Sequence, residues 1–304
     1  MEKRVIKTVI VLLGPTASGK TALAVALAKT LPSEIISADS RQVYRDMNIG
    51  TGKDLDLYND IPYHLINICE AGEKYNLARF QADFEIAAKQ IIDHQKTPIL
   101  CGGTGMYIQA VIQGFKDTEI PENHAFRASL EKHSDEELLQ EIHEKGGDFK
   151  NMDTSTRKRK IRILEKLHFV LTCPTPILEP EIPNYTFVVF GLNPEVKDRR
   201  QHISKRLAER LNNGLIEEVR GLLKNGIPHE TLQYYGLEYK YVSLYLSGEM
   251  SETEMHQKLE TEIHRYAKRQ MTFFRSMESK GIEIKWLPDN LKLEAKVYYI
   301  LKNV

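Results

Sequence analysis

The sequence predicts an α/β fold: a P-loop NTPase-like parallel sheet core, with an inserted helical subdomain and a helical C-terminal part. Three observations lead to this prediction. Residues 14–21 form a complete G-x-x-x-x-G-K-S/T loop, flanked by an apolar run and by an Ala- and Leu-rich run. Strand-like and helix-like segments then alternate, which is typical of a parallel sheet. A polar helical stretch and a long helical C-terminal part follow.

The first strand is expected at Val5–Leu13, which is rich in β-branched residues, and the first helix at Thr21–Leu31. In nucleotide- and ATP-binding proteins, a loop between two such elements holds a chain of phosphates with its backbone N–H groups. Lys20 can reach a terminal phosphate, and the Thr21 hydroxyl can bind Mg²⁺. The expected diphosphate-binding residues of this loop are Gly14, Pro15, Thr16, Ala17, Ser18, Gly19, Lys20 and Thr21.

A short strand is expected at Glu34–Ala38, and it delivers Asp39 to the sheet edge that carries the phosphate loop. The Asp39 carboxylate is a candidate general base or magnesium ligand, and the alternative is an Asp that caps the next turn. Arg41 and Gln42 offer forked, planar hydrogen bonding suited to base edges.

A helix at Leu77–His94 and a strand at Thr97–Cys101 come next, and a second glycine-rich turn follows at Gly102–Gly105. This turn places Thr104 on the same edge of the sheet. By itself, the turn is equally compatible with a tight connection between a strand and a helix.

The sequence as a whole predicts three domains: residues 1–114, 115–180 and 181–304. Ser134 and Glu137 read as a capping box in the polar insertion. Four prolines mark a linker before a buried strand at Tyr185–Leu192. A helix is expected at Asp198–Leu223 and a last short strand at Ile282–Trp286. The linker prolines are Pro174, Pro176, Pro180 and Pro183.

Composition predicts a cytoplasmic protein without a membrane partner. The 304 residues include 42 Lys+Arg and 42 Asp+Glu, so any nucleic acid must be bound by local basic patches. The cysteines Cys69, Cys101 and Cys173 form no CxxC pair, which indicates reduced thiols and excludes a zinc site or a disulfide framework. No run approaches the ~18 apolar residues of a membrane helix.

Six ordered blocks carry a resemblance that covers nearly the whole chain. They are GPTASGKT, DSRQVYRDMNIGTGK (39–53), PYHLINI (62–68), YNLARF (75–80), GGTGMY (102–107) and YAKRQMTFFR (266–275). Together they resemble the tRNA dimethylallyltransferase family, also called tRNA isopentenyltransferases or IPP transferases. The resemblance implies transfer of a dimethylallyl group from dimethylallyl diphosphate to N6 of the adenosine 3′ of the tRNA anticodon. Diphosphate is released.

Roles follow from the resemblance position by position. Lys20, Asp39 and Thr104 are implied as catalytic: Lys20 for charge on diphosphate, Asp39 as proton acceptor and Thr104 for placing the adenosine. Apart from the resemblance, Arg206 and Arg210 are four residues apart on a helix and share a face. They are assigned to the diphosphate, and the alternatives are a contact to the RNA and ordinary surface charge. The implied tRNA contacts are Asp39, Ser40, Arg41, Gln42, Thr104, Arg127, Lys158, Arg159, Lys160, Ile161, Arg162, Lys268, Arg269, Gln270 and Arg275.

The departures from the family pattern lie in the RNA-facing half. The chain has Tyr235-Gly-Leu-Glu238 where the family carries a G-Y-K/R element, and Phe273 where a Trp is usual. The sequence therefore predicts a divergent branch with retained chemistry and a shifted RNA preference.

Three other functions fit the sequence less well. The same chemistry on AMP or ADP is disfavoured because a free nucleotide needs no extended basic surface. A small-molecule ATP kinase is disfavoured because DSRQ follows the second strand in place of a Walker-B ending. A tRNA-binding protein without activity is disfavoured because Lys20, Thr21, Asp39 and Thr104 are all present. The expected state is a monomer that uses Mg²⁺.

Overall fold

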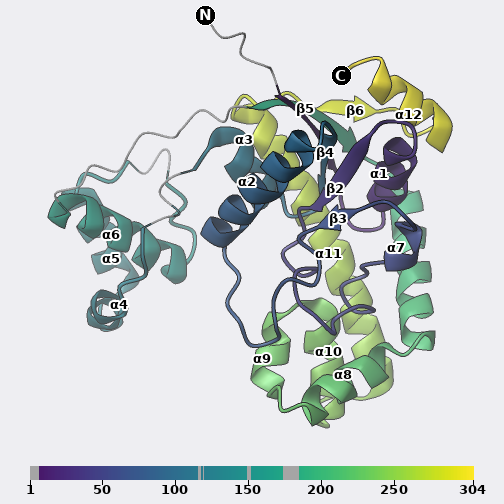
Figure 1. The fold of residues 1–304 in the computed structure, drawn as a ribbon. Helices are drawn as coiled ribbons and strands as arrows, with labels where there is room; N and C mark the ends of the chain where they lie inside the picture. The colour runs from purple at the N-terminus through teal and green to yellow at the C-terminus, as the bar shows by residue number, and fades with distance from the viewer. Residues whose placement is uncertain (1–6, 116–117, 119, 149–151, 174–184) are drawn as a thin grey trace, which may run out of the picture. The chain divides into compact units, whose positions relative to one another are not determined.

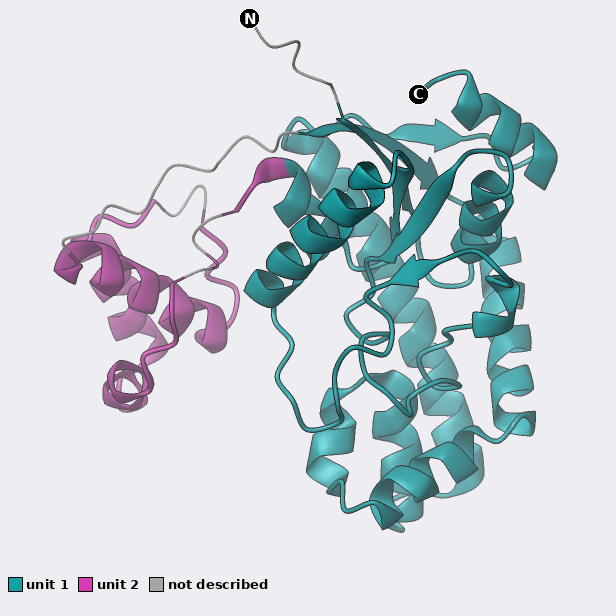
Figure 2. Cartoon of the chain, viewed as in Figure 1, with its two compact units in different colours: residues 1–112, 183–304 teal, residues 113–182 magenta. Residues whose placement is uncertain are grey.

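The structure is a computed structural model that describes residues 7–115, 118, 120–148, 152–173 and 185–304. The chain divides into two compact units (Figure 2). One comprises Met1–Ile112 and Pro183–Val304, and the other comprises Gln113–Ile182. The expected linker prolines 174, 176, 180 and 183, and the first two residues of the expected strand Val5–Leu13, lie outside the described residues.

The first unit is built on a six-stranded, wholly parallel sheet with strand order β3-β2-β4-β1-β5-β6 (Figure 1), which confirms the predicted fold class. Because β1 is central, its carboxyl end lies beside those of β4 and β5. The strands are β1 (Lys7–Leu13), β2 (Ser33–Ser37), β3 (Tyr63–His64), β4 (Thr97–Gly102), β5 (Tyr185–Leu192) and β6 (Lys285–Leu287).

Alternate residues of β1 build separate cores on the two faces of the sheet, as the period of two requires. Val9, Val11 and Leu13 join a core with side chains from α2, α3 and α7–α11, whereas Ile10 and Leu12 join a core with α1 and α12. The helices of this unit are α1 (Lys20–Ala28), α2 (Leu77–Asp93), α3 (Gly105–Gln113), α7 (Val196–Asn212), α8 (Leu215–Lys224), α9 (His229–Tyr234), α10 (Leu237–Leu246), α11 (Glu252–Ser279) and α12 (Leu293–Leu301).

The structure confirms the strand at Tyr185–Leu192, corrects two other expectations and adds one strand that was not expected. The helix expected at Asp198–Leu223 is two helices, because Gly214 has φ of +98° and ends the helical path between α7 and α8. The last strand is Lys285–Leu287, not Ile282–Trp286. The two-residue strand β3 gave no pattern from which it could be predicted.

The second unit contains α4 (His124–Leu130), α5 (Asp135–Glu144) and α6 (Arg157–Thr172). Its small core comprises Leu130, Leu138, Ile142, Ile161 and Leu164. The predicted capping box of Ser134 and Glu137 is confirmed at the start of α5. No helix among the described residues combines the length and the apolar character that crossing a membrane requires.

Candidate active site

Three loops leave the carboxyl ends of neighbouring strands and form the candidate site. Residues 14–19 follow β1, residues 38–42 follow β2, and residues 103–104 follow β4. Since β2, β4 and β1 are adjacent in the sheet, these loops lie together at one edge, where open α/β sheets bind ligands.

The phosphate loop presents unpaired donors toward a ligand. Gly19 caps α1 without a side-chain hydrogen bond, and the first turn of α1 has no acidic residue, so its N–H groups and helix dipole favour an anion. Ala17 adopts a left-handed conformation with φ of 58°, a strain that functional loops tolerate. The Ser18 hydroxyl is buried and has no hydrogen-bond partner among the described residues. An unpaired buried hydroxyl is costly, so a ligand oxygen is its natural partner.

The Lys20 ammonium is held inside this loop. Its Nζ donates to the Pro15 carbonyl at 2.7 Å. Burial, with a smaller contribution from Arg206, lowers the pKa of Lys20 to about 8 against the opposing effects of Cys101 and Asp39. A bound diphosphate would add the negative charge that favours the protonated ammonium.

The loops after β2 and β4 are bonded directly to each other. The Ala38 carbonyl accepts the Thr104 N–H at 3.1 Å, and Thr104 Oγ1 accepts the Ser40 N–H at 3.1 Å. A Cβ on Gly102 would lie 2.2 Å from the Ala38 oxygen, so this approach requires glycine. Thr104 is thereby fixed beside Asp39.

Asp39 caps its own turn, as the alternative interpretation expected, and this leaves a second carboxylate oxygen. Its Oδ1 accepts the Arg41 N–H at 2.9 Å. That bond orients the carboxylate, and among the described residues Oδ2 has no hydrogen-bond donor. A capping role and a proton-accepting role are therefore compatible in one side chain.

Gln270 joins the phosphate loop to the second glycine turn. The side chain is buried on α11, where Oε1 accepts the Thr16 N–H at 2.8 Å and Nε2 donates to the Gly103 carbonyl at 2.9 Å. The sequence placed Gln270 among the RNA contacts. Its amide is instead used within the protein, across two loops of the site.

The two predicted diphosphate arginines occupy different surroundings. Arg206 donates to the Gly52 carbonyl at 3.3 Å, and burial, together with Arg210, lowers its pKa. Because Arg206 also lowers the pKa of Lys20, the two cations lie in one electrostatic neighbourhood. Arg210 forms an ion pair with Glu238 at 2.8 Å. Of the two, Arg206 is the one whose charge acts on the pKa of Lys20.

Two charged residues that the sequence gave no role organise the loop after Asp39. Glu218 accepts the N–H groups of Asn48, Ile49 and Gly50 at 2.8, 2.7 and 2.9 Å, and the Tyr239 hydroxyl at 2.7 Å. Nothing in the local sequence around Glu218 signals this role.

Lys53 is the second such residue, and it is 1% exposed. Its ammonium donates to the Tyr44 carbonyl and to the Asn48 and Asn67 side chains. Burial lowers the pKa of Lys53 to about 8, against the opposing effect of Glu218. The GTGK block that contains Lys53 was the only signal in the sequence.

Some of the predicted RNA contacts of the first unit are made within the protein, and others are exposed on its surface. Gln42 is used internally, since its Oε1 accepts the Ser37 hydroxyl and its Nε2 donates to the Gly52 carbonyl. Arg41 lies over the Tyr234 ring, 5.0 Å from its centroid. Three cations form an exposed basic face of α11: Lys268, Arg269 and Arg275.

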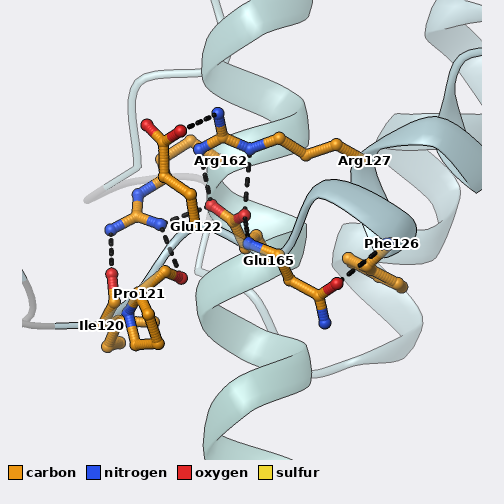
Figure 3. A network of polar contacts seen from close by, with 8 residues as sticks. Ile120, Pro121, Glu122, Phe126, Arg127, Arg162 and Glu165 are labelled. Carbon is orange, nitrogen blue, oxygen red and sulfur yellow. Dashed lines mark hydrogen bonds and ion pairs between the residues drawn. The ribbon is translucent and has the colours of Figure 1, made fainter. Parts of the chain in front are cut away.

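In the second unit, several predicted RNA contacts are tied to carboxylates (Figure 3). Arg127 Nε and Nη2 donate to the two oxygens of Glu165 at 2.9 and 2.8 Å, and Arg162 bonds to Glu165 and to the Ile120 carbonyl. Burial alone would raise the pKa of Glu165, but these bonds and the Asn123 N–H lower it to about 2. This network stabilises the unit around a buried carboxylate.

The rest of the basic run divides by exposure. Lys160 is buried, with Nζ 2.8 Å from Asp135, and Ile161 belongs to the small core. Lys158 and Arg159 are exposed, and Arg159 pairs with Asp153 at 2.6 Å. Lys158 and Arg159 are thus the residues of this set with cationic groups at the surface.

Two family models match this chain. Residues 42–277 match the family model described as IPP transferase, and residues 7–58 match the one described as isopentenyl transferase. The chain is 50% identical over 286 residues to tRNA dimethylallyltransferase 1 of Azobacteroides pseudotrichonymphae, covering 91% of this chain and 92% of the relative. It is 46% identical to tRNA dimethylallyltransferase 2 of Bacteroides fragilis, covering 96% of both chains.

A solved structure extends the similarity to three dimensions. The tRNA isopentenylpyrophosphate transferase of Bacillus halodurans superposes with a TM-score of 0.72 at 30% identity, covering 98% of this chain and 95% of that chain.

Proposed function

The chain belongs to the IPP transferase family, and from this premise we propose that it transfers a dimethylallyl group from dimethylallyl diphosphate to N6 of an adenosine in tRNA. The acceptor is the adenosine 3′ of the anticodon. The observation that carries the proposal is the meeting of a phosphate loop, a turn-anchored carboxylate and Thr104 at one sheet edge.

The reaction makes one bond and breaks one. The N6 amine of the adenosine attacks C1 of the dimethylallyl group, and the C1–O bond to diphosphate breaks. The proton that N6 loses passes to the Asp39 carboxylate, which the Arg41 N–H holds in place. Negative charge that develops on the leaving diphosphate is stabilised by the Lys20 ammonium and by the N–H groups at the start of α1.

The residues present fit a Mg²⁺ ion. No group of three or more His, Cys, Asp and Glu side chains with metal-site geometry occurs among the described residues. Mg²⁺ bound to phosphates commonly takes few protein ligands and keeps several waters. The Thr21 hydroxyl would hold the ion together with diphosphate oxygens, and the ion would supply charge neutralisation on the leaving group.

Because the chain has no net charge, the RNA is bound by local basic surfaces. Lys268, Arg269 and Arg275 are exposed on α11, and Lys158 and Arg159 are exposed on α6. Cations of this kind bind phosphates without reading sequence, so each of the two surfaces can contribute to tRNA affinity.

A product assay tests the proposal. The protein is incubated with dimethylallyl diphosphate, Mg²⁺ and either unmodified tRNA or AMP, and the digested products are analysed by mass spectrometry. We expect N6-dimethylallyladenosine from tRNA, at the position 3′ of the anticodon, and none from AMP. Product from AMP alone would assign the protein to free nucleotides, and product from neither acceptor would refute the proposed reaction.

A further inference from the structure

The proposed function gives no role to Tyr234, an exposed aromatic side chain that is linked to Asp39 through Arg41. Tyr234 ends α9, and its side chain is 58% exposed. The Arg41 guanidinium lies over its ring at 5.0 Å from the centroid, a cation–π distance. The Arg41 N–H donates to Asp39 Oδ1, so the Arg41–Tyr234 pair is linked directly to the proposed proton acceptor.

Electrostatic effects on a neighbouring tyrosine also place the pair at the site. Burial raises the pKa of Tyr107, and Tyr44, Tyr234 and Asp39 raise it further, whereas Arg41 lowers it. Tyr107 belongs to the helix that follows the second glycine turn. Tyr234, Arg41 and Asp39 thus all act on the pKa of one side chain of α3.

Tyr234 stands on a rigid aromatic support. Its ring meets Tyr235 edge-on with centroids 5.9 Å apart, and Tyr235 meets Tyr44 at 4.6 Å. Tyr235 and Tyr44 are 2% and 1% exposed, and the Tyr235 hydroxyl accepts the Gly72 N–H. Because Tyr234 packs against buried rings, its ring loses little conformational entropy when another planar group stacks on it.

A second tyrosine–arginine pair lies in the same neighbourhood, on α11. Tyr266 is 37% exposed, and Arg269 lies 6.0 Å from its ring centroid. Partial burial and then Asp39 raise the pKa of Tyr266, and Arg41 opposes them. Two such pairs near one carboxylate are a surface suited to planar, electron-rich, anionic chains, and unpaired RNA has these properties.

We propose that the Arg41–Tyr234 pair is a stacking platform for one unpaired base, the immediate neighbour of the adenosine that reacts at Asp39. This inference rests on the proposed function. To bring N6 to Asp39, the adenosine must leave the base stack of its loop, so its neighbour loses a stacking partner. The guanidinium, 5.0 Å from the centroid of the Tyr234 ring, replaces that partner, and its N–H groups can donate to base or phosphate oxygens.

Binding of an anticodon stem-loop RNA tests the platform. Tyr234→Ala should weaken RNA affinity by about tenfold, the scale expected for loss of one stacked base, whereas Tyr234→Phe, which keeps the ring, should stay within threefold of wild type. Affinity for dimethylallyl diphosphate should not change. Tyr298→Ala is the matched control, because Tyr298 on α12 is 59% exposed and has Lys302 over its ring at 4.5 Å. It should bind RNA as wild type does.

Abasic RNAs identify the stacked base. Removal of the base on one side of the target adenosine should weaken binding to the wild type about tenfold and should not weaken binding to Tyr234→Ala further. RNA affinity of Tyr234→Ala equal to wild type, or losses that simply add, would overturn the platform. If wild type shows this base-dependent coupling but does not prenylate the RNA, the proposed reaction fails and the platform stands.

Discussion

Replacing Gln270 with Leu removes the bridge between the phosphate loop and the second glycine turn. The substitution leaves the Thr16 N–H and the Gly103 carbonyl without their partners at 2.8 and 2.9 Å. The Thr16 bond is partly exposed, so water can replace it at a cost of about 1 kcal/mol, whereas the Gly103 bond is buried and its loss costs about 2 kcal/mol. We expect the unfolding free energy to fall by about 3 kcal/mol, and the unfolding midpoint of this 304-residue chain to fall by roughly 5 °C.

Loss of the Gln270 bridge should also slow the reaction, because the bridge positions two loops of the site. The bridge sets Thr16, in the diphosphate loop, against Gly103, next to Thr104. A displacement of about 1 Å between reacting groups costs on the order of 10²-fold in rate, so the turnover number of Gln270→Leu should fall by this factor while tRNA affinity stays near wild type.

Thermal unfolding, dimethylallyl transfer and tRNA affinity at several salt concentrations are measured together. Lys268→Ser is the matched control, since Lys268 is exposed on the same helix. It should weaken tRNA binding in a salt-dependent way and leave the unfolding midpoint unchanged. If Gln270→Leu instead behaved like Lys268→Ser, with wild-type stability and turnover, the RNA-contact interpretation of Gln270 would be correct and the bridge would be refuted as a positioning element.

Two further predictions concern charge. Because the pKa of Lys20 in the free protein is lowered to about 8, its charge is present below pH 8 and is lost above it. Binding of dimethylallyl diphosphate should therefore weaken from pH 7 to pH 9.5 in wild type and stay constant in Lys20→Arg, and equal pH profiles in titration calorimetry would contradict this. Replacing both Lys158 and Arg159 by Ser should weaken tRNA binding. The slope of log affinity against log salt concentration should fall by up to ~0.9 for each RNA phosphate that these cations neutralise. Arg162→Ser should instead mainly lower the unfolding midpoint, because Arg162 bonds to Glu165. Parallel salt plots of equal height for the double variant and wild type would remove these two cations from the RNA surface.

The elements that the sequence predicts well are those set by local pattern. The G-x-x-x-x-G-K-T loop, the buried strand at Tyr185–Leu192 and the capping box at Ser134 depend on residues close together in the chain. The parallel arrangement then follows from the alternation of strands and helices. The split between α7 and α8 was missed, because a single Gly in a helical pattern is compatible with both outcomes.

The parts of the site that sequence could not predict depend on contacts between distant residues. Gln270 bonds to Thr16 across 254 positions, and Glu218 bonds to Ile49 across 169. In α6, the apolar period indicates that Ile161 is buried, but not that Lys160 turns to Asp135. The choice of an ion-pair partner depends on tertiary packing, which a basic run does not encode.

Single-turnover transfer by Asp39→Asn tests most directly the claim that Asp39 accepts the proton from the attacking amine. Asn keeps the side-chain oxygen that accepts the Arg41 N–H, so the turn and both substrate affinities should be retained. With enzyme saturated by dimethylallyl diphosphate and anticodon stem-loop RNA, we predict a rate of product formation at least ~10²-fold below wild type at every pH. A rate near wild type across the pH range would contradict the claim and leave Asp39 as the cap of its turn.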